Sequence, residues 1–344
     1  MRILVSVDPE IPVPPRFYGG IERIVDGLIT ELRLRQHQVG LVAHPDSTCK
    51  ADYLQHWPGA MSNRATDSLR NTRALWDAVR SFKPDVVHSF SRLGYLLPLL
   101  LGRLPKVMSY QRHTGGSRNR LAALLGGNGL AFTGCSELIA AQGRRWGGRW
   151  EAIPNFVDTD FFQFNPSVAP DAPLVFLSRV ERLKGAHTAI AIARGAGRRL
   201  IIAGNRVNEG EGADYWKAEI APYVGRDGID YVGPVDDAQK NRLLGMAAAM
   251  VVPIEWDEPF GIVFAEALAC GTPVISSPRG ALPEIVEHGK HGFLTMSVDE
   301  GVSAVARLNE IDRNGCRDRA ERLFSRPVVV SRYENLYREM HRNR

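Results

Sequence analysis

Two glutamates, Glu258 and Glu266, lie eight positions apart around the expected start of a helix. Pro259 favours extended conformations for the residue before it and suits the first positions of a helix, so we expect Glu258 in a loop and Glu266 in the helix that follows. Carboxylates accept hydrogen bonds from neighbouring sugar hydroxyls. The pair is therefore suited to hold two sugar rings, one of them a ribose, rather than to act as acid and base on one bond.

An anion can be held between the two carboxylates by the start of the helix itself. We expect the helix to open around Phe260–Ile262 and to close near Gly271, which Pro273 follows. The unpaired N–H groups of the first turn, among them those of Gly261 and Ile262, favour a phosphate. Because Gly261 has no side chain, the ligand can come close. The pattern predicts a site for a polar ligand that carries phosphate.

The run from Glu258 to Leu294 resembles the signature of the retaining glycosyltransferases of family 4, which have the GT-B fold. In that signature two Glu residues flank Phe-Gly and lead into Glu-Ala-x-Ala-x-Gly-x-Pro-Val. A looser similarity extends over nearly the whole chain. The resemblance implies transfer of a sugar from a nucleoside diphosphate donor to a hydroxyl acceptor, with Glu258 on the donor sugar and Glu266 on the ribose. We expect neither a metal ion nor a cofactor, because the nucleotide sugar is a substrate.

Arg179 and Lys184 lie in the segment that follows the first strand expected in the second half of the chain. Both side chains can reach a diphosphate, Arg179 through its planar fork and Lys184 as a point charge. Cations at this place would stabilise the diphosphate as it departs in the transition state. Members of the family hold the diphosphate with this Arg and Lys, so the resemblance implies the same role here.

Two further features match the first domain of the family. Gly19 and Gly20 open the first long helix, expected over residues 21–35, and permit close approach of the backbone to phosphate or acceptor. They look like the family's first-domain glycine loop. His113 follows the strand expected over residues 107–110, where family members commonly place a His near the reacting sugar carbon.

Several other positions match or depart from known glycosyltransferase patterns, but they say less about the site. Gly204 and Val232 end strands of the second domain, where family members contact the nucleotide base through backbone groups, so the base cannot be named. In the first domain, Phe90 stands where the family pattern Asp-Val-Val-His-x-His has its second His. Asp158 and Asp160 are spaced as in the metal site of the other glycosyltransferase fold, but their place between the domains fits turn chemistry better.

Length and composition are those of a globular protein with two domains. The chain has 344 residues, of which 44% are hydrophobic and 24% charged. Its first residues read as a buried strand rather than a signal peptide, and no apolar run approaches the roughly 20 residues that a membrane span needs. The four cysteines are scattered without metal-ligand or redox spacing, which favours reduced thiols in a cytoplasmic protein.

The net charge of +5 is unevenly distributed. Residues 101–150 contain eight Lys or Arg against one Glu, a net of +7, and Trp146 and Trp150 lie among them. This combination is suited to peripheral contact with an anionic membrane surface or to an acidic acceptor, and it is also typical of a solvated basic face. No nucleic-acid-binding module accompanies the basic residues, so nucleic acid is not expected as a partner.

Short apolar runs alternate with amphipathic segments along the whole chain. This alternation predicts an α/β protein with two doubly wound, Rossmann-like parallel sheets, which in the GT-B arrangement face each other across a cleft. The expected strands are 3–7, 39–43, 86–88, 107–110, 131–133, 174–178, 200–203, 229–232, 250–252 and 274–276. We expect an acceptor-side domain over residues 1–160, a nucleotide-sugar-binding domain over 161–326, and a terminal helix over 327–344 that packs back on the first.

The sequence thus predicts a retaining, metal-independent glycosyltransferase of the hexosyl type. Lipid, oligosaccharide and natural-product acceptors all remain open. The alternatives that share this architecture are a nucleotide-sugar epimerase, a sugar phosphorylase, and an inactive module that only binds a sugar nucleotide. The intact set of Glu258, Glu266, Arg179 and Lys184 argues against the inactive module. A phosphorylase would ordinarily show a lysine for pyridoxal phosphate in a longer chain.

Overall fold

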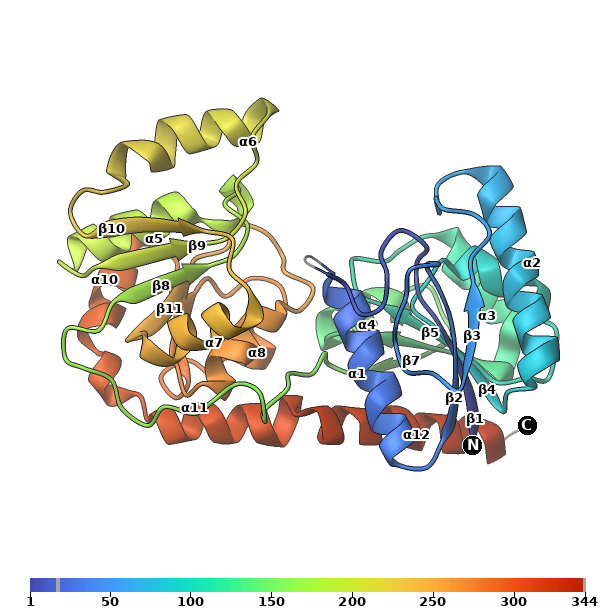
Figure 1. Ribbon diagram of the computed structural model, residues 1–344. Coiled ribbons are helices and arrows are strands. Elements are labelled where there is room, and N and C mark those ends of the chain that lie inside the picture. Colours follow the sequence, from blue (N-terminus) through green and yellow to red (C-terminus); the bar gives the residue numbers. More distant parts are fainter. Residues whose placement is uncertain (17–18, 343–344) are drawn as a thin grey trace. The chain divides into compact units, whose positions relative to one another are not determined.

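The structure, a computed structural model, describes residues 1–16 and 19–342 and contains two compact units (Figure 1). The first unit comprises Met1–Asn155 and Arg326–Arg344, and the second comprises Phe156–Ser325. Each unit has its own parallel β-sheet with helices packed against it. The predicted fold class, two doubly wound Rossmann-like α/β domains, is confirmed.

The second unit begins at Phe156 and not at residue 161, where the sequence placed it. The reason is local pairing with the end of the same unit. The backbone N–H of Val157 donates to the carbonyl of Phe324 at 2.8 Å, and Val157 forms an isolated bridge with Ser325. These contacts tie the start of the unit to its last residues, so the chain enters and leaves the unit at one place.

The first unit is built on a sheet of seven parallel strands within the described residues, in the order β3-β2-β1-β4-β5-β6-β7. Its strands are β1 (Arg2–Ser6), β2 (Gln38–Ala43), β3 (Tyr53–His56), β4 (Val86–Ser89), β5 (Lys106–Tyr110), β6 (Leu130–Gly134) and β7 (Arg149–Ala152). Its main helical segments are α1 (Gly20–Leu34), α2 (Ala65–Phe82), the 3₁₀ segment η1 (Leu93–Leu99), α3 (Ser117–Gly126), α4 (Glu137–Arg144) and α12 (Arg326–Arg342). The chain reverses its direction across the sheet between β1 and β4, which makes this the switch point at which such sheets bind ligands.

The second unit, all of whose residues the structure describes, has a six-stranded parallel sheet in the order β10-β9-β8-β11-β12-β13. Its strands are β8 (Leu174–Leu177), β9 (Leu200–Ala203), β10 (Ile229–Gly233), β11 (Ala249–Val252), β12 (Val274–Ser276) and β13 (Gly292–Leu294). Its main helical segments are the 3₁₀ turn η3 (Arg182–Lys184), α5 (Ala186–Gly195), α6 (Gly210–Tyr215), α7 (Asp237–Met246), α8 (Ile262–Ala269), α9 (Leu282–Ile285), α10 (Val298–Ala306) and α11 (Arg313–Arg319). Its switch point lies between β8 and β11.

All ten strands expected from the sequence are present, and the strands that it missed lie at sheet edges. Central strands of a parallel sheet are buried on both faces and read as continuous apolar runs. In β1, for example, Ile3, Leu4 and Val5 are completely buried. The missed strand β3 instead alternates half-buried and exposed residues, and β7 is largely half-buried, so neither gives a continuous apolar run.

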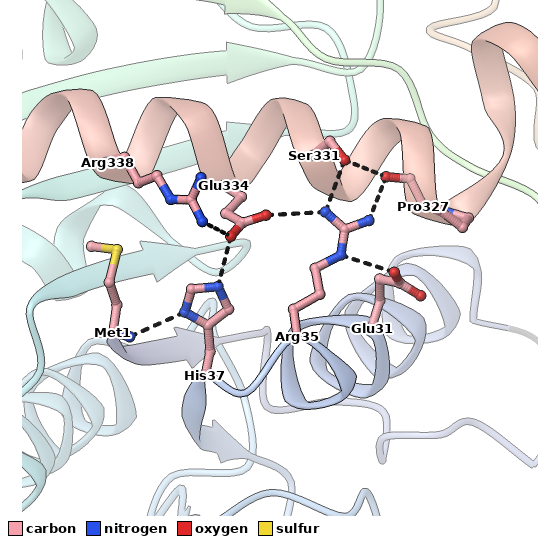
Figure 2. Close-up of polar contacts among 8 residues, drawn as sticks. All are labelled: Met1, Glu31, Arg35, His37, Pro327, Ser331, Glu334 and Arg338. Atoms are coloured by element: carbon pink, nitrogen blue, oxygen red, sulfur yellow. Dashed lines mark hydrogen bonds and ion pairs between the residues drawn. The ribbon is translucent and has the colours of Figure 1, made fainter.

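Helix α12 completes the first unit although it follows the second unit in sequence. Figure 2 shows its Glu334 at the end of α1, where the carboxylate accepts hydrogen bonds from Arg35 and His37, each at 3.0 Å, and lies 2.5 Å from Arg338. Burial raises the pKa of Glu334, but the bonds from His37 and Arg35 outweigh that effect and lower it. Arg35 also donates to the carbonyl of Pro327 at 2.7 Å. One arginine therefore ties the first turn of α12 to α1.

The inner side of α12 packs on His88 of β4. The rings of Tyr333 and Tyr337 lie 4.9 and 5.5 Å from the His88 ring, centre to centre, and Phe90 lies 4.3 Å from it. The two nitrogens of His88 lie 2.5 Å from the Tyr337 hydroxyl and 2.6 Å from the Ser109 hydroxyl. Burial lowers the pKa of His88 to about 3, which keeps the ring neutral. His88 and Phe90 are therefore core residues under α12.

Candidate active site

The loops that follow β8 and β11 carry four of the residues expected in the site, and these two strands flank the switch point of the second sheet. The loop after β8 contains Arg179 and ends with η3, which includes Lys184. The loop after β11 contains Glu258 and leads into α8. The loops are joined directly, because the N–H of Glu255 donates to the carbonyl of Leu183 at 2.8 Å.

Lys184 and Glu258 form an ion pair between these loops. The ammonium Nζ lies 2.5 Å from Oε2 of the carboxylate, and the two side chains are only 12% and 13% exposed. The indole N–H of Trp256 donates to the same oxygen at 3.1 Å, and Lys184 Nζ lies 4.7 Å from the centre of the indole ring. The structure thus joins two residues that the sequence assigned to different parts of one donor. Sequence reasoning missed Trp256, which has no motif of its own.

Two glycines hold the Glu258 loop in place. Gly261, the N-cap of α8, has φ +83°, and a Cβ placed on it would lie 2.5 Å from the ring of Phe264 and 3.1 Å from Cγ of Glu258. Gly280 has φ +61°, and its Cβ would lie 2.2 Å from the backbone nitrogen of Glu258. The N–H of Ala281 also donates to the carbonyl of Glu258 at 2.9 Å. Sequence reasoning missed Gly280, because only the fold brings the segment after β12 against this loop.

Glu266 lies inside α8, which begins at Ile262 as the sequence predicted. Its Oε1 is 2.6 Å from Nζ of Lys240 on α7, and the Glu266 side chain is 11% exposed. Lys240 also approaches Asp237 at 3.3 Å. Burial lowers the pKa of Lys240, but the Glu266 and Asp237 carboxylates together outweigh burial and the pKa is raised. Sequence reasoning missed Lys240, which reads as an ordinary surface lysine of a helix.

Arg179, Gly204 and Val232 lie at the carboxyl ends of neighbouring strands. Gly204 has φ +143°, and a Cβ there would lie 3.5 Å from the backbone nitrogen of Arg179 and closer still to the preceding carbonyl. The N–H of Gly204 donates to the carbonyl of Gly233 at 2.8 Å, next to the half-exposed Val232. The Arg179 side chain is 48% exposed and its Nη1 lies 2.7 Å from Glu181. The ends of β8, β9 and β10 therefore meet at one edge.

In the first unit, α1 begins at Gly20 with Gly19 as its N-cap, within one residue of the expected start. A Cβ on Gly19 would lie 2.6 Å from Cβ of Pro15 and 2.8 Å from a carboxylate oxygen of Glu22, so this glycine is required by the chain's own packing. His113 is exposed, and its Nδ1 lies 3.2 Å from the side-chain oxygen of Gln142.

A polar cluster that the sequence did not indicate lies at the switch point of the first sheet. Asp8 follows β1, Arg92 follows β4 and Arg112 follows β5, and each guanidinium lies 3.8 Å from the Asp8 carboxylate. Burial raises the pKa of Asp8 to about 6, against the effect of Arg92. Among the described residues, Asp8 Oδ1 is buried without a hydrogen-bond partner. An acceptor atom of this kind is suited to a hydroxyl from a ligand.

The described part of the chain contains no group of three or more His, Cys, Asp or Glu side chains arranged to hold a metal ion. Asp158 forms the expected turn, accepting from the N–H groups of Asp160 and Phe161 at 3.2 and 3.1 Å. The four cysteines are buried and are not joined by disulfide bonds. Within residues 1–16 and 19–342, no helix is both long enough and apolar enough to cross a lipid bilayer.

Two family models match the chain: Glycosyltransferase Family 4 over residues 18–161 and Glycosyl transferases group 1 over residues 158–322. A glycogen synthase of Mycobacterium tuberculosis is 32% identical over 363 residues, which cover 90% of this chain and 86% of that protein. The chain belongs to the GT4 family of GT-B glycosyltransferases. With other curated relatives the match is shorter, and the chain spans about a third of their length.

Solved structures show the same fold as this glycosyltransferase over nearly its whole length. Sucrose-phosphate synthase from Thermosynechococcus elongatus aligns with a TM-score of 0.80 at 20% identity, covering 100% of both chains. HepE of Anabaena, solved in complex with UDP-glucose, aligns with a TM-score of 0.74 at 19% identity, covering 98% of this chain and 100% of the other. At these identities the likeness establishes the fold of the glycosyltransferase, as the sequence predicted.

Proposed function

We propose that this glycosyltransferase moves a sugar from a nucleoside diphosphate donor to a hydroxyl acceptor with retention of anomeric configuration. The observation that carries the proposal is the pairing of Lys184 with Glu258 beside the first turn of α8. A cation, a carboxylate and unpaired backbone donors are thereby gathered at the switch point of one sheet. The complex of HepE with UDP-glucose supports a nucleoside diphosphate sugar as the donor.

The donor diphosphate binds Lys184 and Arg179, with the N–H groups of Gly261 and Ile262 as further donors. Glu258 accepts hydrogen bonds from the sugar. Because Glu258 already contacts Lys184 at 2.5 Å, the diphosphate and the carboxylate compete for one ammonium group. A diphosphate carries more charge than a carboxylate, so it draws the lysine away and leaves Glu258 to bind hydroxyls.

Glu266 binds the ribose hydroxyls in this proposal. Lys240 contacts only Oε1 among the oxygens of that carboxylate, which leaves lone pairs on Oε2 for a hydroxyl donor. Lys240 also compensates the charge of the largely buried carboxylate and holds it in place. Backbone groups near Gly204 and Val232 contact the base.

Catalysis is mainly electrostatic. The bond between the anomeric carbon and the diphosphate oxygen breaks, and its electron pair leaves with the diphosphate, whose charge Lys184 and Arg179 stabilise. The acceptor oxygen forms the new bond on the same face. Its proton passes to the leaving phosphate oxygen, so neither a protein nucleophile nor a metal ion is required.

We assign acceptor binding to the first unit. Asp8, with a buried oxygen that has no hydrogen-bond partner among the described residues, accepts a hydrogen bond from an acceptor hydroxyl. The turn at Gly19 and Gly20 lies at the start of α1, beside the same switch point. His113 is proposed to hydrogen-bond a hydroxyl of the reacting sugar, as the family pattern implies.

The first test measures the unfolding temperature of the protein with UDP, GDP, ADP and dTDP and with their sugar derivatives. The donor that stabilises the protein is then radiolabelled in its sugar and incubated with panels of hydroxyl acceptors. We expect label in an acceptor product whose anomeric configuration matches that of the donor. An isomerised donor would identify an epimerase, and phosphate-dependent cleavage a phosphorylase. Binding without any turnover would identify a sugar-nucleotide binding module and contradict the proposal.

A further inference from the structure

Helical segments α2, η1 and α3 cover one face of the first sheet as a single layer. Their inward side chains belong to one hydrophobic cluster, with Leu75 from α2, Leu96 from η1 and Ala122 from α3. The turn after η1 also approaches the turn after α3, because a Cβ on Gly129 would lie 3.7 Å from the carbonyl oxygen of Gly102. We call the outward sides of these three segments the docking face.

Large apolar side chains point outward from this layer. Leu101 is 81% exposed and Leu124 is 73% exposed. The other exposed apolar residues of the layer are Leu69, Trp76, Leu97, Leu121 and Leu125. Single exposed leucines are ordinary on protein surfaces, but several gathered on one layer mark an interaction surface.

The cations of α3 lie on the same helix stripes as its exposed leucines. Arg118, Leu121 and Leu125 follow the i, i+3, i+7 spacing, and Arg120 and Leu124 are separated by four positions. All five side chains are exposed. The outer side of α3 therefore carries arginines on its first turns and leucines on its last turns.

A hollow of about 350 Å³ adjoins these stripes. Arg120 and Leu124 of α3 line it together with Arg145 and Trp146, which follow α4. Three small residues, Ala123, Gly147 and Gly148, complete its lining. Two guanidinium groups beside an indole and a leucine match a phosphate group attached to an apolar chain.

The charge of the segment that contains η1 and α3 has one sign. From residue 86 to residue 136 the sequence has no Asp or Glu, and it has six Lys or Arg. Within the described residues, Arg118, Arg120 and Arg145 have no carboxylate partner, whereas Arg144 pairs with Glu137. A second copy of this positive surface would be repelled, while acidic lipids would be attracted.

We propose that the docking face binds the surface of anionic lipid bilayers. Leucines of α3 and the end of η1 enter the boundary between headgroups and acyl chains, and Arg118, Arg120 and Arg145 contact lipid phosphates. The buried Lys106 supports this surface, because its Nζ donates to the carbonyls of Leu99 and Gly102 at 2.9 and 2.8 Å and so fixes the end of η1. This binding is independent of the transferase reaction proposed above.

The experiment is sedimentation of the full chain with vesicles of phosphatidylcholine alone and of phosphatidylcholine mixed with phosphatidylglycerol. We expect partitioning to the anionic vesicles at least ~10-fold stronger than to the neutral ones, decreasing as salt is added, because each arginine near an anionic surface adds to the attraction. Equal partitioning to both vesicle types, or no binding at low salt, would overturn the proposal.

Matched variants separate the docking face from general surface properties. Leu121→Ser with Leu124→Ser should weaken binding at least ~10-fold, since both leucines lose their insertion into the acyl region. Leu34→Ser is the control, because Leu34 is similarly exposed, at 70%, and lies on α1, which packs with α12. Circular dichroism and thermal unfolding should be unchanged in all variants, because the replaced side chains are exposed.

Charge variants complete the test. Arg118→Gln with Arg120→Gln should reduce anionic partitioning and flatten its salt dependence, whereas Arg332→Gln on the exposed side of α12 should not. If the charge and leucine variants of α3 bind vesicles as the native chain does, the proposal is wrong. If the leucine variants instead abolish concentration-dependent dimerisation seen by light scattering, the face is an interface between copies of the chain and the membrane proposal is also overturned.

Discussion

At the scale of single residues, each of the two glutamates proposed for the site has its own lysine. Glu258 pairs with Lys184 at 2.5 Å and Glu266 pairs with Lys240 at 2.6 Å. Both pairs are largely buried, where loss of one charge leaves the other uncompensated. The sequence could single out the glutamates and Lys184 as candidates because they lie in motifs. Lys240 could not be singled out, because its contact with Glu266 depends on how α7 packs beside α8.

Glu258→Ala should lower kcat/KM by more than ~10-fold, a loss of roughly 1.4 kcal/mol or more of transition-state stabilisation. The change removes the acceptor for sugar hydroxyls and leaves Lys184 without its carboxylate. Steady-state kinetics with the identified donor measures the change in kcat/KM. Glu255→Ala is the matched control, since Glu255 lies in the same loop but pairs with His187 at 3.0 Å. Equal rates in the native chain and Glu258→Ala would contradict the assigned role.

Lys240→Met should raise the KM for the donor by about 10-fold, with kcat less affected, because Glu266 is proposed to bind the ribose and not the reacting centre. Without the cation, the largely buried Glu266 carboxylate loses its partner charge and should bind the ribose hydroxyls less well. Calorimetric titration of the nucleoside diphosphate measures the loss of affinity. The exposed Lys217 provides the control as Lys217→Met, and a donor affinity in Lys240→Met equal to the native one would refute this prediction.

At the scale of elements, the site depends on segments that are distant in sequence. The helix α8 and the strands before each loop were predicted correctly from apolar patterns and from Pro259 and Gly271. The contact between Gly280 and Glu258 was not predicted, because a local sequence pattern does not show which loops lie against each other in the fold. The polar cluster around Asp8 was missed for the same reason, since its members follow three different strands.

Gly280→Ala should lower both stability and kcat/KM, while Gly289→Ala should affect stability alone. Both glycines have positive φ, at +61° and +78°, so each substitution carries a backbone cost of about 1 kcal/mol. A Cβ at Gly280 would also lie 2.2 Å from the backbone nitrogen of Glu258. A Cβ at Gly289 would have no neighbouring heavy atom within 4 Å. Urea unfolding and kinetics on both variants measure the difference. Equal activity in the two would show that the Glu258 loop does not depend on Gly280.

The contact between α12 and His88 should make the first unit sensitive to acid. Burial lowers the pKa of His88 from 6.5 to about 3, so below about pH 6.5 the unfolded chain binds a proton that the folded chain does not. Stability therefore falls as pH falls from 6.5 towards 3, by up to ~1.4 kcal/mol per pH unit from this residue.

Urea midpoints measured as the pH is lowered should show this loss in the native chain. The loss should be smaller in His88→Gln, which keeps a side-chain donor and acceptor but cannot take up the proton. His56→Gln, at an exposed histidine, is the control and should follow the native chain. A His88→Gln curve parallel to the native curve would exclude His88 as the cause.

At the scale of the whole molecule, the division into two α/β units was predictable from the alternation of apolar runs. The exact boundary between the units was not predictable, because the backbone hydrogen bond that joins Val157 to the second unit is made to Phe324, which lies far along the chain. The first unit is made from two separate parts of the sequence, and its last helix buries Val329, Val330, Tyr333, Leu336 and Tyr337.

A chain ending at Ser325 should lose the fold of its first unit and keep that of its second. Each large side chain that α12 buries contributes roughly 1.5–3 kcal/mol, so their removal exceeds the stability of a typical domain. Thiol labelling followed by mass spectrometry reports the two units separately. Cys49 and Cys135 of the first unit should become reactive, while Cys270 and Cys316 should stay protected, since burial raises the pKa of each to about 12. Protection of all four would show that α12 is dispensable.

The place of α12 in the sequence also sets an order of events on the ribosome. Residues 1–155 emerge first, but the nascent chain lacks the helix that covers His88 until the whole second unit has been translated. At roughly 5–20 residues per second, that interval is on the order of 10 s. The second unit is continuous in sequence and can fold during it, so the half of the protein that is made first is the half that is completed last.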